Sequence, residues 1–198
     1  MITIGLTGGI ATGKSTVAQI IREELNVPVI DADQVSRDVV ATGSTGLAVL
    51  VQAFGPQILR SDGALDRKSL GQLVVGDAVA RRQLEGLTHP LIREEIEARL
   101  LSLEGGGAAV AVVEAALMVE TGSFRFYDQI IVVTCRPEVQ LKRLMARENL
   151  SEGQAEQWLA TQSPLARKEA IATCIIRNDG ELKDLPSLVH QAWQQIEY

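Results

Sequence analysis

Short apolar runs alternate with longer amphipathic stretches along this chain of 198 residues. An apolar run of roughly four to eight residues between turn residues is typical of a buried strand, whereas apolar positions three and four apart are typical of a helix. The order of the runs predicts an α/β fold, with a doubly wound parallel sheet of about five strands between two layers of helices. The expected strands are residues 2–6, 27–30, 108–113, 129–134 and 173–177.

One part of the chain is more helical than a single crossover between two strands requires. Residues 42–104 have a mostly helical pattern, and we expect a helical insertion on the substrate side at about 60–95. The whole chain, residues 1–198, is expected to be one domain. A last helix is expected at about 185–196.

Several residues in the helical part mark element boundaries. Asp66 and Asp77 are suited to cap the helices that follow them. Pro90 predicts a kink or a helix boundary, because proline disfavours helical backbone at the residue before it, His89. His89 is also a candidate base or substrate contact, with Arg93 one turn later on the same face. A structural histidine is the alternative.

Residues 8–15 read G-x-x-x-x-G-K-S, the phosphate-binding P-loop, and they lie between a predicted strand and a predicted helix, as the motif requires. Gly8 and Gly13 allow the tight turn that brings backbone N–H groups against phosphate oxygens, and the helix N-terminus adds a positive dipole end. Lys14 can reach the β- and γ-phosphates, and the Ser15 hydroxyl can ligate Mg²⁺. An ordinary glycine-rich turn is the alternative.

Carboxylates follow two of the predicted strands. Asp31 and Asp33 come after the second strand, at the edge where open α/β sheets bind their ligands. Either carboxylate could approach a substrate hydroxyl or could cap the next helix. Glu114 follows the third strand, the usual place for a magnesium contact in P-loop enzymes. A solvent-facing or capping glutamate is the alternative.

The densest basic cluster is Lys142, Arg143 and Arg147. Arg143 and Arg147 are four residues apart, so they share a helix face. Arginines on a lid neutralise a transferring phosphoryl group, and residues 151–168 are polar and helical in pattern. We therefore expect a mobile lid at about 147–168. A solvated helix face is the alternative.

Composition excludes several classes of protein. The 19 basic and 25 acidic residues give a net charge of −6, which argues against a general nucleic-acid binder. No apolar run approaches the roughly 20 residues of a membrane span and no signal peptide opens the chain, so we expect a cytoplasmic enzyme without a membrane partner. Cys135 and Cys174 lack a CxxC pattern and are expected to be buried free thiols. The oligomeric state is not predicted.

The chain resembles the dephospho-CoA kinase family over nearly its full length. The Asp-Ala-Asp and His-Pro-x-Ile-Arg blocks are more specific than the P-loop, which by itself indicates only a nucleotide. The matching segments, in the family's order, are residues 5–10 with 13–16, 30–33 with Arg37, 65–67 with Leu70 and Gly71, 89–93, 120–122, Gln140 with Arg143, Leu144 and Arg147, and Ile176 with Asn178 and Gly180.

This resemblance implies a P-loop NTPase fold in which ATP, with Mg²⁺, phosphorylates the ribose 3′-hydroxyl of dephospho-CoA, the last step of coenzyme A biosynthesis. It implies Asp33 as the general base, with Lys14 and Arg143 as the other catalytic residues and Ser15 on the metal. The implied ATP-binding residues are Gly8, Ala11, Thr12, Gly13, Lys14, Ser15, Thr16, Arg147 and Asn178. The implied substrate-binding residues are Asp33, Arg37, Asp66, Arg67, His89 and Arg93.

Four places depart from the family's pattern. Ala11 and Thr12 stand where Gly-Ser is usual, and Ala11 lacks the freedom of glycine at positive φ. Glu114 replaces an aspartate, which leaves its role at the metal open. Gln157 stands where arginine is common, and Thr173 replaces an acidic residue. None of these changes removes the P-loop lysine, the P-loop serine or the implied base.

Two rival functions remain at this stage. One is another P-loop small-molecule kinase, acting on a nucleoside monophosphate or a shikimate-like alcohol; residues 89–93 favour the CoA precursor over these acceptors. The other is a nucleotide-dependent switch or a non-catalytic ATP-binding module. A GTPase would need Asn-Lys-x-Asp, which does not occur in the chain, and a degenerate module is expected to lose Lys14 or Asp33, which are both present.

Overall fold

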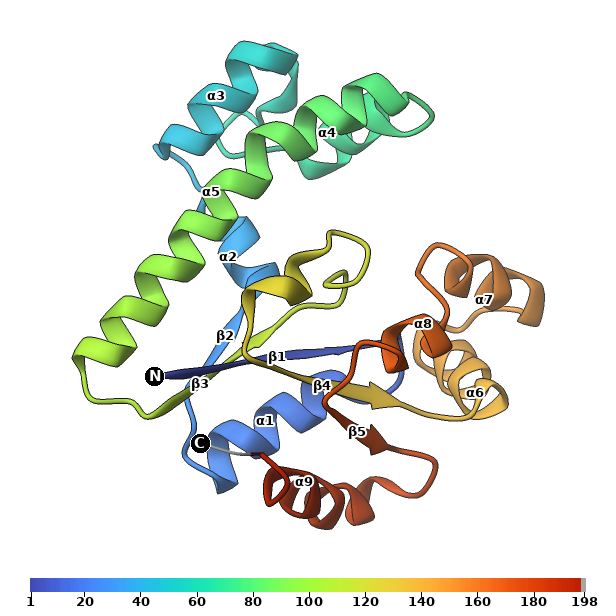
Figure 1. Ribbon diagram of the computed structural model, residues 1–198. Coiled ribbons are helices and arrows are strands. Elements are labelled where there is room, and N and C mark those ends of the chain that lie inside the picture. Colours follow the sequence, from blue (N-terminus) through green and yellow to red (C-terminus); the bar gives the residue numbers. More distant parts are fainter. Residues whose placement is uncertain (197–198) are drawn as a thin grey trace. The chain divides into compact units, whose positions relative to one another are not determined.

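The computed structural model describes residues 1–196 and divides the chain into two compact units (Figure 1). The first, called the sheet unit here, comprises residues 1–31 and the chain from Leu103 onward. The second, called the helical unit, comprises residues 32–102. The predicted insertion at about 60–95 falls inside the helical unit, and each unit is described by itself.

Within the described residues, the sheet unit contains five parallel strands, as the apolar runs predicted, and the structure gives their order as β2-β3-β1-β4-β5. Parallel strands end at one edge of the sheet, so residues that are far apart in sequence meet there. Asp31 pairs in register with Glu114, which pairs with Leu6 of the strand that leads into the P-loop. The strands are β1 (Ile2–Gly8), β2 (Val29–Asp31), β3 (Val110–Glu114), β4 (Gln129–Thr134) and β5 (Cys174–Arg177).

Helices cover both faces of this sheet. On one face, α1 (Lys14–Glu24) and α9 (Leu185–Trp193) bury a continuous apolar core against the strands (Figure 1). On the other face, Ile130 and Val132 of β4 pack with Met118 and with Ile171, which follows α8 (Leu165–Glu169). Burial of both faces explains why the strands read as continuous apolar runs rather than as alternating ones. The remaining helices are α6 (Pro137–Glu148), α7 (Glu152–Leu159), η2 (Ser123–Phe126) and η3 (Leu182–Asp184).

The helical unit has its own apolar core, formed by residues such as Leu50, Ile58 and Leu70. The predicted caps are confirmed: Asp66 accepts hydrogen bonds from the N–H groups of Lys68 and Ser69, and Asp77 caps the next helix in the same way. The elements are α2 (Ala32–Asp38), α3 (Thr45–Phe54), η1 (Pro56–Ile58), α4 (Arg67–Val74) and α5 (Ala78–Gly105), whose last residues belong to the sheet unit.

The predicted helix boundary at Pro90 is wrong, because α5 runs through it without a break. A proline inside a helix costs about 3 kcal/mol, and contacts on both sides offset that cost. Before the proline, Leu84 and Leu87 pack against the core of the helical unit. After it, Arg99 donates a hydrogen bond to Asp38 at 2.7 Å. The contacts of α5 on both sides of Pro90 therefore stabilise the helix more than the proline destabilises it.

Two other boundaries also differ from expectation. The stretch predicted to be helical at 151–168 forms two helices, α7 and α8, with a turn at 160–164 between them. The last helix ends at Trp193 rather than near Ile196, although Ile196 is still buried. Cys135 and Cys174 are buried free thiols, as predicted. Within residues 1–196, no helix has both the length and the apolarity to span a membrane.

Candidate active site

The P-loop joins the end of β1 to the start of α1, and two of its three glycines, Gly8 and Gly13, are the ones that the motif requires. A Cβ on Gly8 would lie 2.5 Å from the Val133 carbonyl oxygen, and a Cβ on Gly13 would lie 2.4 Å from Asn178 Nδ2. Gly13 also has a φ of 97°, in the left-handed region. As the N-cap residue of α1 it has no side chain to satisfy the first helical N–H groups. Those groups are therefore available to an anion.

Ala11 takes a left-handed conformation with a φ of 59°, the region in which glycine is favoured. Its neighbour Thr12 is fully buried, and its N–H and hydroxyl donate to the Gly9 carbonyl at 3.3 and 2.8 Å. The hydroxyl of Thr12 thus stabilises the turn from inside. The alanine, in contrast, carries a cost of about 1–2 kcal/mol for its backbone conformation.

Replacing Ala11 by glycine should relieve this cost. Glycine loses more conformational entropy on folding, which offsets about half of the gain, so the free energy of unfolding of Ala11→Gly should rise by about 0.5–1 kcal/mol. Urea denaturation of the two proteins measures the difference. The helical Gly86, which has no neighbours within 4 Å of an added Cβ, provides the opposite control. Gly86→Ala should also raise stability, through helix propensity. A destabilised Ala11→Gly would show that the left-handed residue is not strained.

The P-loop lysine is paired with a carboxylate. Lys14 Nζ donates a hydrogen bond to Glu114 Oε1, and both side chains are largely buried. The solvent-facing alternative for Glu114 is therefore wrong: the residue is the buried end of β3, beside Asp31 of β2. A triphosphate that reaches Lys14 has to share or displace this ion pair.

Arg143 of α6 is directed at the loop that follows β5. Its guanidinium donates to the Asn178 carbonyl at 2.7 Å and to the Gly180 carbonyl at 2.8 Å. The buried Asn178 in turn donates from Nδ2 to the Thr12 carbonyl at 2.8 Å. Asn178 therefore connects the P-loop to the candidate arginine, a structural contact that the sequence did not indicate. Arg147 is exposed and pairs with Glu148 at 2.9 Å.

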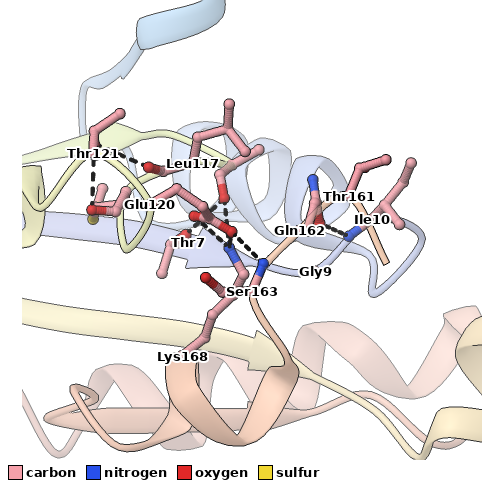
Figure 2. Close-up of polar contacts among 12 residues, drawn as sticks. Thr7, Gly9, Ile10, Leu117, Glu120, Thr121, Thr161, Gln162, Ser163 and Lys168 are labelled. Carbon is pink, nitrogen blue, oxygen red and sulfur yellow. Dashed lines mark hydrogen bonds and ion pairs between the residues drawn. The ribbon is translucent and has the colours of Figure 1, made fainter. Parts of the chain in front are cut away.

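A second buried lysine lies beyond β3. The Lys168 side chain is fully buried, and its ammonium donates to the Ala116 carbonyl at 2.8 Å and to the two carboxylate oxygens of Glu120 at 2.9 and 3.0 Å (Figure 2). Glu120 also accepts the Ser163 N–H at 2.7 Å. Burial alone raises the pKa of Glu120, but the hydrogen bonds from Ser163 and Lys168 outweigh it, and the pKa lies below its ordinary value of 4.5.

The lowered pKa of Glu120 predicts a pH dependence of stability. The Glu120 carboxylate makes its full contribution to the free energy of unfolding above its ordinary pKa. That contribution is lost as the pH falls through the lower pKa that Glu120 has in the folded protein. Glu120→Gln should lower the free energy of unfolding by about 1–2 kcal/mol at pH 7, because the buried Lys168 loses its counter-charge while water at the exposed Glu120 screens part of the effect. The gap to the wild type should narrow between about pH 5 and pH 3.

Urea denaturation across this pH range measures the effect. Glu97→Gln, which removes an exposed carboxylate on α5, is the matched control and should follow the wild type at every pH. If the free energies of unfolding of Glu120→Gln and the wild type differ by the same amount down to pH 3, the charge of the Glu120 carboxylate does not stabilise the fold.

The remaining candidates lie on the helical unit, where the structure shows their local surroundings. Asp33 is the second residue of α2, inside the helix rather than at the N-cap position. Asp66 uses its carboxylate as a cap, and hydrogen bonds from the backbone and hydroxyl of Ser69 hold its pKa below the ordinary value. The other candidates are exposed side chains: Arg37 on α2, Arg67 on α4, and His89 and Arg93 one turn apart on α5.

The donor atoms near the P-loop suit magnesium. Mg²⁺ prefers oxygen ligands and is commonly held by one or two protein groups together with substrate phosphates and water. Ser15 offers a hydroxyl in the first turn of α1, and Glu114 offers a carboxylate beside Lys14. Among residues 1–196, no cluster of three His, Cys, Asp or Glu side chains could hold a metal without a substrate. The residues therefore fit an ion that arrives with a nucleotide.

Sequence reasoning missed the residues that brace the P-loop from other elements. Asn178 was expected only as an ATP-binding residue, Gln162 and Lys168 fell within the expected lid, and Gln140 matched the family's pattern without a role of its own. The sequence around them gives little signal, because Lys168 stands between Arg167 and Glu169 and Gln162 stands between Thr161 and Ser163, where exposed side chains are expected. The hydrogen-bond partner lies more than 40 residues away in each case and cannot be found from spacing.

Known proteins share this architecture. A family model described as CoaE: Dephospho-CoA kinase matches residues 2–184. The chain is 46% identical over 193 residues to the dephospho-CoA kinase of Geobacter sulfurreducens, with 98% of each chain covered. It is 43% identical over 198 residues to the dephospho-CoA kinase of Moorella thermoacetica, covering 100% of this chain and 93% of the relative.

Solved structures agree with these relatives. A dephospho-CoA kinase from Campylobacter jejuni matches with a TM-score of 0.74 at 29% identity, covering 98% of this chain and 96% of that one. A shikimate kinase from Acinetobacter baumannii matches with a TM-score of 0.53 at 16% identity, covering 98% and 92%. The second likeness shows the fold alone.

Proposed function

The chain belongs to the dephospho-CoA kinase family, and we propose that its residues transfer the γ-phosphoryl group of ATP to the ribose 3′-hydroxyl of dephospho-CoA, giving coenzyme A and ADP. The observation that carries this proposal is the intact P-loop with its Lys14–Glu114 pair, in a chain that the family model matches over residues 2–184. The oligomeric state has no part in the proposal, and the cytoplasm is the proposed compartment.

The P-loop binds the triphosphate. The N–H groups of Ala11 and of residues 13–16 surround the phosphates, while the Thr12 N–H stays on the Gly9 carbonyl, and the N-terminal end of α1 adds its partial positive charge. Lys14 leaves Glu114 for the β- and γ-phosphates, and the Ser15 hydroxyl and the Glu114 carboxylate would hold the metal ion. Mg²⁺, when bound with ATP, supplies positive charge that offsets the charge of the phosphates.

Asp33 activates the acceptor. It follows the last residue of β2 by two positions, at the end of the strand where ligands of α/β sheets bind. Its carboxylate orients the ribose hydroxyl and accepts its proton as the phosphoryl group is transferred. The exposed basic residues of the helical unit, Arg37, Arg67 and Arg93, with His89, attract the phosphate groups of the CoA precursor.

Arg143 stabilises the charge that spreads over the transferring group, with Arg147 beside it. In the structure its guanidinium is held by the carbonyls of residues 178 and 180. These contacts keep the arginine close to the P-loop through Asn178. The lid proposed at about 147–168 then closes over the bound nucleotide and excludes water, and the insertion at about 60–95 receives the acceptor.

A panel of acceptors tests the proposed substrate. Purified protein with ATP and Mg²⁺ is expected to consume ATP with dephospho-CoA and to give a product with the mass of coenzyme A, because the charged groups of the helical unit suit that acceptor. AMP, adenosine and shikimate should give only the background rate. Equal turnover with one of these three would move the chain to a different kinase specificity, and no turnover with any acceptor would favour a non-catalytic module.

The role of Asp33 has its own test. Asp33→Asn should lower kcat with dephospho-CoA by a factor of about 10² to 10⁴, the range for loss of a general base, and should leave the KM for ATP nearly unchanged. Asp62→Asn is the matched control, since Asp62 lies in an exposed turn. The amide oxygen of the new asparagine can still accept the hydrogen bond from the Ala64 N–H. Near-normal kcat in Asp33→Asn would remove this carboxylate from the role of base.

A further inference from the structure

Two side-chain amides contact the backbone of a single P-loop residue, Ile10. The Gln162 side chain accepts a hydrogen bond from the Ile10 N–H at 2.9 Å (Figure 2). Gln140 Nε2 donates to the Ile10 carbonyl at 2.8 Å. Gln140 is a buried residue of α6, and Gln162 lies in the turn between α7 and α8. Ile10 is therefore held on both of its polar groups by elements that follow β4.

These contacts fix two consecutive peptide planes. In the plane between Gly9 and Ile10, the carbonyl accepts from Thr12 and the N–H donates to Gln162. In the plane between Ile10 and Ala11, the carbonyl accepts from Gln140. Because a trans peptide places its N–H opposite its carbonyl, this last hydrogen bond also sets the direction of the Ala11 N–H. That N–H is the first of the loop amides assigned above to the phosphates.

The next residue makes this restraint necessary. Ala11 has a left-handed φ of 59°, and such a conformation persists only where the surroundings over-determine it. Without the two glutamines, rotation of Ala11 to a negative φ would turn the adjoining peptide planes away from the phosphates. The two hydrogen bonds to Ile10 oppose that rotation from the preceding residue.

The neighbouring residues are arranged to admit and hold the two amides. A Cβ on Gly9 would lie 2.5 Å from Gln140 Nε2 and 2.7 Å from Leu165 Cδ2, so the missing side chain gives Gln140 access to the loop. Gln162 is fixed from the other side, because the N–H of the next residue, Ser163, donates to Glu120 at 2.7 Å. Glu120 is itself bound by the fully buried Lys168 (Figure 2).

We propose that Gln140 and Gln162 are positioning residues for the triphosphate of ATP. They act through the backbone of Ile10, which they hold so that the P-loop amides converge on one point before the nucleotide arrives. The inference rests on the proposed function only in taking ATP as the bound nucleotide, and it does not depend on which acceptor is phosphorylated.

Isosteric removal of each amide tests this proposal. Gln162→Met and Gln140→Met keep the length of the side chain and remove the hydrogen bond. Gln191→Met makes the same change at an exposed position of α9. The dissociation constant of ATP with Mg²⁺ is measured by calorimetry without any acceptor, and exchange of the Ile10 amide hydrogen is followed by NMR without nucleotide.

We expect ATP to bind about 5- to 100-fold more weakly to Gln162→Met and to Gln140→Met, the range for an amide deprived of its partner. The Ile10 amide should exchange faster in Gln162→Met, while the Thr12 amide keeps its protection. Because both glutamines act through one residue, the double variant should bind ATP less weakly than the product of the two single effects predicts. The melting temperature of Gln162→Met should match that of the wild type and of Gln191→Met.

ATP affinity within twofold of the wild type in both variants would overturn the proposal. So would a purely structural effect, in which the melting temperature falls while the folded protein binds ATP normally. If Gln140→Met does not fold, the affinity and the Ile10 exchange of Gln162→Met decide the question, since Gln162 is only partly buried. If dephospho-CoA is not phosphorylated while the glutamine variants bind ATP as weakly as expected, only the proposed substrate is contradicted.

Discussion

The site depends on a stretch of backbone whose shape its own residues do not favour. Residues 8–13 must bring several N–H groups to one side, and this requires left-handed conformations at Ala11 and Gly13. Glycine meets the requirement at one position, while alanine has to be held at the other. Hydrogen bonds from outside the loop, including the bond from Asn178 to the Thr12 carbonyl, supply the restraint. The elements that follow β4 and the loop after β5 thus hold the P-loop in its shape before any ligand binds.

The segment from Glu114 to Glu120 joins two ion pairs, and the lysine of each pair is largely buried. Its first residue pairs with Lys14 of the P-loop, and its last pairs with Lys168 of α8. A lysine removed from water needs such a partner, because the cost of desolvation is several kcal/mol. The two pairs differ in whether the lysine can change its partner. Lys168 directs all its hydrogen bonds to groups of the protein, whereas Lys14 can exchange its carboxylate for a phosphate. An acidic chain thereby keeps one cation ready for an anionic ligand.

Patterns of short range predicted the strands, the P-loop and the helix caps, because each of these depends on residues that are close in sequence. The structure departs from prediction where distant contacts decide. Pro90 remains helical because both halves of α5 are packed, and Lys168 is buried because Glu120 and the Ala116 carbonyl receive it. Thr173, which stands where the family has an acidic residue, has a structural explanation. Its hydroxyl accepts a hydrogen bond from the Ile130 N–H and donates one to the Ile130 carbonyl, at the start of the β4–β5 pairing. The structure offers no comparable explanation for glutamine at position 157.

The attachment of Gln140 and Gln162 to one P-loop residue has an entropic consequence. The chain between them, which contains α7 and most of α6, has both ends fixed at the same point. The entropy of bringing these ends together is lost when the protein folds, and not when a ligand arrives. A ligand that needs the P-loop in this shape therefore does not have to supply that entropy from its own binding free energy.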